Sequence, residues 1–115
     1  MKDSIRRRIE VQAERWEELG RALADPSIEG GSTQFREASV EYSRLTPLAE
    51  LWRTFLSHEQ ELEAVRALAA DADADMRELG TEEATRLVAA LQADEHELRR
   101  MLVPVDPRDI RNIYL

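Results

Sequence analysis

Two stretches of the sequence place apolar side chains at alternating intervals of three and four residues, the spacing of one face of an α-helix. The first seam consists of Leu48, Leu51, Phe55, His58, Leu62, Val65 and Ala69. The second seam consists of Ala84, Leu87, Leu91, Asp94, Leu98 and Met101. In an antiparallel hairpin, the numbers of two facing residues add up to nearly the same value at every level. The residues of these two seams pair at sums of 152 and 153. The pairing predicts a long helical hairpin packed knobs-into-holes.

Each seam contains one polar residue, and the register places both at the same level. His58 of the first seam faces Asp94 of the second. A carboxylate that orients an imidazole could act as a general-base pair. The sequence favours a hydrogen-bonded polar layer that fixes the register, because neither a nucleophile nor a phosphate-binding loop accompanies the pair. We therefore predict His58 and Asp94 to be a structural polar pair, with no catalytic residue.

Most of the remaining chain is also predicted to be helical, because the sequence holds only four glycines and four prolines and is rich in Ala, Leu, Glu and Arg. A first helix is expected over 4–24, with Asp3 or Ser4 as its cap. Its apolar stripe comprises Ile5, Ile9, Trp16, Leu19 and Leu23, and both Trp16 and Trp52 are expected in the core. A second helix begins after Ser32 or Thr33, with Phe35, Ala38, Tyr42 and Leu45 on its stripe.

Three positions set the remaining helix boundaries. At Pro47 either a third helix starts, with Thr46 as its cap, or one long helix kinks. The stretch 71–80 is expected to be a turn with a short helical piece, and Thr81 is expected to cap the last helix. The predicted fold class is all-α: an antiparallel bundle of three to four helices with a long helical hairpin, followed by a short C-terminal extended segment.

Charge and cysteine content exclude several classes of function. Sixteen Lys and Arg against 24 Asp and Glu leave a net charge of -8, which argues against nucleic-acid binding by the surface as a whole. The absence of cysteine removes disulfides, zinc thiolates and iron–sulfur clusters. No apolar targeting region or membrane-spanning window occurs in the sequence, so we expect a cytoplasmic protein without membrane contact.

Two histidine motifs for metals fail on single residues. His58 begins a zinc-protease helix motif, but Leu62 occupies the place of the second histidine. A di-iron bundle requires Glu three residues before each histidine, where this chain has Phe55 before His58 and Ala93 before His96. The sequence therefore predicts neither a metal nor a cofactor at these positions.

An acidic turn copies part of the carboxylate spacing of a calcium-binding EF-hand loop. Asp71, Asp73 and Asp75 alternate, and Glu82 follows them. The sharp turn of such a loop needs glycine at its sixth position, and Met76 stands there. We therefore predict a solvated acidic turn. The run from Arg6 to Arg8 is similarly expected to be solvated, although such arginines could touch a phosphate.

The last residues follow a different pattern from the helices before them. Pro104 and Pro107 exclude a helix, and 111–115 resembles the start of a β-strand. A lone strand would have no partner, so we expect the chain to end at a domain boundary. This divides it into a helical bundle domain over 1–103 and a connector with the start of a strand over 104–115.

This connector carries a family resemblance. Pro104, Asp106-Pro107, Asp109 and Arg111-Asn112 resemble the join after the N-terminal helical domain of bacterial peptide chain release factor 1. Phe35-Arg36, Tyr42 and Met76-Arg77-Glu78 also resemble that family, and the similarity extends over all 115 residues. The same architecture occurs in release factor 2, which matches the connector less well.

The resemblance implies a role in translation termination at UAA and UAG stop codons. The family hydrolyses peptidyl-tRNA through a Gly-Gly-Gln loop that this chain lacks, so the implied role is non-catalytic docking. The implied partners are the stalk base and factor-binding region of the large ribosomal subunit, and the class-II release-factor GTPase. No direct sequence-specific nucleic-acid binding is implied for this segment. The residues leave two other classes open: a free-standing helical adaptor or oligomerisation module, and a small helical enzyme or metal carrier.

Overall fold

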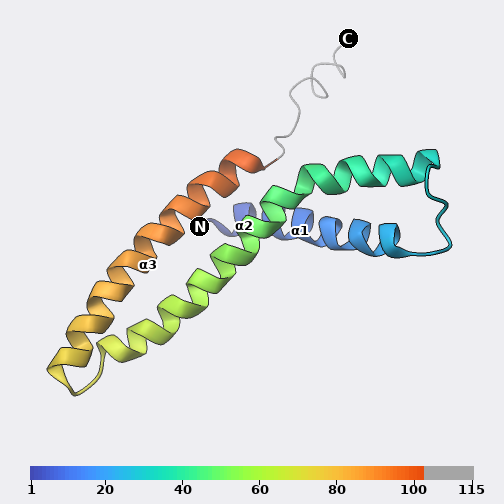
Figure 1. Cartoon of the computed structure of the whole chain (residues 1–115). Helices are drawn as coiled ribbons and strands as arrows, with labels where there is room; N and C mark the ends of the chain where they lie inside the picture. The colour runs from blue at the N-terminus through green and yellow to red at the C-terminus, as the bar shows by residue number, and fades with distance from the viewer. Residues whose placement is uncertain (103–115) are drawn as a thin grey trace, which may run out of the picture.

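A computed structural model of the chain describes residues 1–102, which form three helices (Figure 1). These are α1 (Asp3–Ala24), α2 (Thr33–Ala69) and α3 (Ala74–Met101). The described residues contain no strand, so the all-α prediction with a long helical hairpin is confirmed. The predicted extended segment and the second domain over 104–115 lie outside the described residues.

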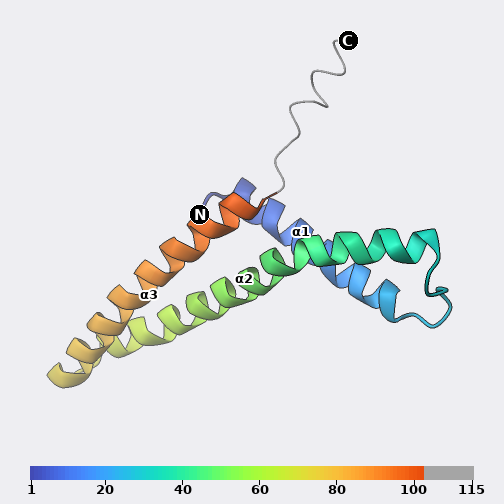
Figure 2. The same ribbon diagram turned by 45° about the horizontal axis from the view of Figure 1, so that its top comes forward.

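The central helix α2 packs against both other helices. In Figures 1 and 2, α1 crosses the first half of α2, whereas α3 lies antiparallel to its second half. The described chain measures 61 × 43 × 16 Å, with a radius of gyration of 19.7 Å. A compact domain of about 100 residues has a radius of gyration near 13 Å. The protein is therefore an elongated single layer of helices with much accessible surface.

The apolar core lies where the three helices meet. It is formed by Ile9 of α1, by Leu48, Trp52 and Phe55 of α2, and by Leu98 and Leu102 at the end of α3. Ile9 and Leu98 are completely buried. Ile9, Leu48, Phe55 and Leu98 come from the predicted stripes, whose residue spacing turns them toward the neighbouring helix. Trp52 and Leu102 were not on these stripes, and the seam residues next to them, Leu51 and Met101, are only partly buried.

Pro47 lies inside α2, which runs through it without interruption. A separate third helix starting at this residue is therefore wrong, and Thr46 is not an N-cap. The Thr46 hydroxyl instead donates to the carbonyl of Tyr42 at 2.7 Å and accepts from the Trp16 indole nitrogen at 2.9 Å. Figure 2 shows α2 changing direction along its length. A proline explains such a bend because it removes a backbone donor and crowds the preceding turn.

Of the other helix caps predicted from the sequence, one is confirmed by the structure and two are wrong. Ser32 caps α2, and its hydroxyl accepts from the Phe35 backbone N–H at 3.0 Å, as predicted. The N-cap of α1 is Lys2, and neither side chain predicted for that role fills it. Thr81 is not a cap either: it lies within α3, and its hydroxyl donates to the carbonyl of Arg77 at 2.8 Å.

α3 starts earlier than the sequence predicted, so Gly80 lies inside it. This glycine is buried within the helix, against the end of α2. A Cβ atom there would lie 2.6 Å from the backbone nitrogen of Ala69 and 2.9 Å from its Cα. Glycine therefore allows α2 and α3 to approach closely beside the turn. From the sequence, glycine at this position is expected at a helix boundary, because residue spacing along one helix does not show which backbone lies opposite.

Candidate docking surface

His58 and Asp94 meet across the α2–α3 hairpin. The Nδ1 atom of His58 lies 2.6 Å from Oδ2 of Asp94, and the two side chains are 26% and 13% exposed. With the carboxyl ionised, Nδ1 carries the proton and donates the hydrogen bond. The structure thus brings together the two residues that the sequence singled out, in the predicted register. Their role as a register-fixing pair stays a prediction.

We expect His58→Leu to lower the free energy of unfolding by about 1–2 kcal/mol, because the half-buried Asp94 then lacks its hydrogen-bond partner. Asp94→Leu should cost a similar amount, and the double variant less than the sum of both. Urea unfolding of the four proteins measures the coupling energy. His96→Leu, at an exposed position of the same helix, is the control, and additive losses would contradict the pairing.

Arg6 connects α1 to α2 and is not simply solvated. Its guanidinium forms a bidentate pair with Glu59, with both N–O distances 3.0 Å, and lies 5.2 Å from the centre of the Trp52 ring. The hydrogen bond with Glu59 raises the pKa of Arg6 above its usual value. Arg6 therefore serves the helix packing, which corrects the expectation of a solvated arginine at this position.

The two tryptophans differ in burial. Trp52 is 7% exposed and belongs to the core, as predicted. Trp16 is half-buried and stacks on Tyr42, with ring centres 5.1 Å apart. Close to this stack, a Cβ atom on Gly20 would lie 3.2 Å from the Tyr42 ring. The stack of Trp16 on Tyr42, together with the Thr46 hydrogen bond, holds α1 against the first half of α2.

The turn between α2 and α3 uses its carboxylates to cap backbone N–H groups. Asp71 Oδ1 accepts from the Asp73 backbone N–H, and Asp73 Oδ1 accepts from the Asp75 N–H, both at 2.8 Å. Arg77 donates to the carbonyls of Asp71 and Ala72 at 3.0 and 2.8 Å. The described residues contain no group of three or more metal-ligating side chains placed together.

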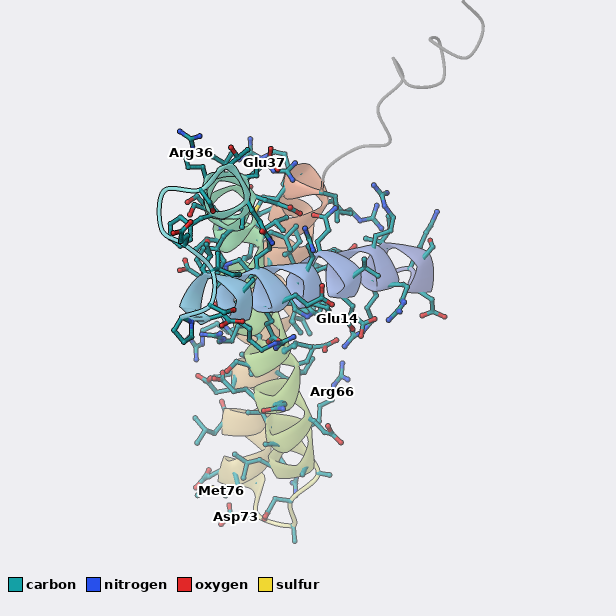
Figure 3. The ribbon with its side chains drawn as sticks, turned by 90° about the vertical axis from the view of Figure 1, so that its right-hand side faces the viewer. Glu14, Arg36, Glu37, Arg66, Asp73 and Met76 are labelled. Carbon is teal, nitrogen blue, oxygen red and sulfur yellow. The ribbon has the colours of Figure 1, made fainter. Side chains whose placement is uncertain are left out.

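The hairpin tip combines negative charge with exposed apolar side chains. The segment 71–86 holds six carboxylates and two arginines. Met76 is 42% exposed and Leu79 is 50% exposed. Figure 3 shows Asp73 and Met76 at the far end of the hairpin, away from α1. An exposed apolar pair within an acidic surface is suited to contact a basic partner surface.

None of the three described helices is long and apolar enough to cross a bilayer. The features above define an elongated all-α protein, in which arginine pairs and a tryptophan connect α1 to α2 and an acidic tip projects from the hairpin. No solved structure matches the chain significantly.

A family model, the PCRF domain, matches residues 12–115. The chain therefore belongs to the peptide chain release factor family, whose proteins act with the ribosome in translation termination. The match includes α2, α3 and most of α1, so the membership applies to the helices described above.

Proposed function

We propose that the chain is the N-terminal helical domain of a release factor of the factor 1 type, acting in the cytoplasm at UAA and UAG stop codons. The observation that carries this proposal is the family match over residues 12–115. The factor 1 assignment rests on the connector motif at Pro104, Asp106 and Asp109. The domain positions the factor, and peptidyl-tRNA hydrolysis belongs to a Gly-Gly-Gln segment that this sequence does not contain.

The proposed docking surface is the tip of the α2–α3 hairpin, facing the factor-binding region of the large ribosomal subunit and its stalk base. The class-II release-factor GTPase acts at the same region. Support comes from the elongated shape, which holds the tip away from the core, and from the exposed Met76 and Leu79. The negative charge of the tip favours contact with basic protein over direct contact with RNA phosphates.

A reconstituted termination reaction tests this proposal. The chain alone should release no peptide from ribosomes stopped at UAA. In excess, it should slow release by a complete factor 1, because both compete for the same docking region. The variant Met76→Asp with Leu79→Asp should lose this inhibition, whereas Val11→Asp, at an exposed site 47% accessible on α1, should keep it.

Two outcomes contradict the proposal. Peptide release by the chain alone would show that it has its own catalytic activity. Failure to inhibit at saturating concentration, with the helices intact by circular dichroism, would remove the docking role. Ribosome pelleting with labelled chain separates weak competition from absent binding.

A further inference from the structure

Two surface grooves follow α2 on the side where α1 crosses it, and they meet at Leu56, which lines both. The first groove lies between α1 and α2, from Ala49 to Leu56 on α2. The second continues from Leu56 to Arg66 and is bounded by Leu91 of α3. Ala49 and Arg66 are separated by about 26 Å along the helix, at about 1.5 Å per residue. This length matches that of a helix of roughly 17 residues.

Apolar and polar side chains share the lining of the two grooves. Ala13 and Trp16 of α1 and Trp52 of α2 line the first groove. Leu56, Leu62 and Leu91 contribute to the second. Apolar side chains spaced along a groove with charged rims suit an amphipathic helix, which places apolar and charged side chains on different faces. The part of the groove beside α1, lined by Ala13, Trp16 and Trp52, lies away from the hairpin tip.

The rim charges identify the chemistry of the partner. On α1, Glu10, Glu14 and Glu17 recur at intervals of four and three residues along the first groove. Among the described residues that line this groove, Arg53 is the basic one. Glu14 is 3.9 Å from Arg7, and the charge of Glu10 acts on Arg6. Three carboxylates along one wall favour lysine or arginine side chains on whatever occupies the groove.

The second groove adds a weaker charge pattern. Glu59 is neutralised by its bidentate pair with Arg6, while Glu63 and Arg66 lie one helical turn apart on the rim. Figure 3 shows Glu14 and Arg66 in the angle between α1 and the lower part of α2. The acidic end of the groove is therefore the end beside α1, and a basic partner helix would place its charges there.

We propose that this groove binds a basic amphipathic helix from a partner protein, with its apolar face on Leu56 and its cationic side chains against Glu10, Glu14 and Glu17. A second copy of this chain is disfavoured as the occupant, because each copy carries a net charge of -8. RNA is disfavoured because its phosphates would face the three carboxylates. The inference rests on the α1–α2 crossing and does not depend on docking by the hairpin tip.

The test uses an 18-residue fluorescein-labelled peptide with leucine on one helical face and lysine on the other. Fluorescence anisotropy should show binding of this probe, and the peptide with glutamate in place of lysine should not bind. The triple variant Glu10→Gln, Glu14→Gln and Glu17→Gln should weaken binding by about tenfold or more. The matched control changes Glu29, Glu37 and Glu61 to glutamine, which alters the net charge equally at exposed sites outside the grooves.

A second variant tests the apolar side chains of the groove. Leu56→Gln should weaken binding of the lysine peptide several-fold, provided that circular dichroism shows unchanged helix content. Equal weakening by the groove and control variants would overturn the proposal, because it would indicate general charge attraction. Preferential binding of the glutamate peptide would overturn it as well, as would a stable dimer that the groove variant dissociates.

Discussion

Leu98→Ala is expected to lower the free energy of unfolding by about 4 kcal/mol. Leu98 is completely buried and packs in the cluster where the three helices meet, beside Ile9 and Phe55. Removing three side-chain carbons there loses the transfer free energy of the apolar atoms and leaves a cavity between helices that cannot close fully. Urea unfolding followed by circular dichroism measures the loss.

Leu79→Ala is the matched control for this substitution. It removes the same atoms from the same helix at a site that is 50% exposed, so its effect should stay within about 0.5 kcal/mol. Losses of equal size at Leu98 and Leu79 would contradict a core at the three-helix junction. Unchanged stability of the Leu98 variant would do so too.

Gly80→Val is expected to lower the free energy of unfolding by about 3 kcal/mol. The new Cβ would lie 2.6 Å from the Ala69 nitrogen and 3.0 Å from the carbonyl carbon of Leu68. These are backbone atoms, which cannot rotate away as a side chain does, so the ends of α2 and α3 must separate. Thermal and urea unfolding both report the change.

Gly30→Val provides the comparison for Gly80. Nothing lies within 4 Å of a Cβ atom at Gly30, and this glycine does not have a positive φ. Its replacement should therefore change stability by no more than about 0.5 kcal/mol. If Gly80→Val were as stable as the parent protein, the close approach of α2 and α3 would be wrong.

The hairpin could be predicted from the sequence because one regularity determines it. Apolar residues at intervals of three and four define a helix face. Two such faces could pair in registers seven residues apart, and the one polar residue in each seam points to a single register. His58 and Asp94 meet in that register. The Ser32 cap was also predictable, because a short side-chain oxygen before a helical stretch has a local role.

The features that the sequence did not reveal depend on contacts between helices. The Thr46 hydroxyl forms hydrogen bonds with Tyr42 and Trp16. From the sequence, the proline that follows it suggested a helix cap instead. Glycine is a residue typical of turns, but Gly80 lies inside α3. Glycine is needed at this position because the opposing backbone of Ala69 leaves no room for a side chain. The groove along α2 depends on the angle at which α1 crosses α2. The residue spacing within each helix does not determine this angle.

The single-layer arrangement implies that the stability of this protein is unequal along its length. Within residues 1–102, only the region around Ile9 and Leu98 is covered by all three helices, whereas the turn near Asp73 belongs to two helices and is exposed. Amide groups near the junction should exchange with solvent through global unfolding, and those near the turn through local opening. The distal end of the hairpin can thus adapt to a surface while the junction stays folded.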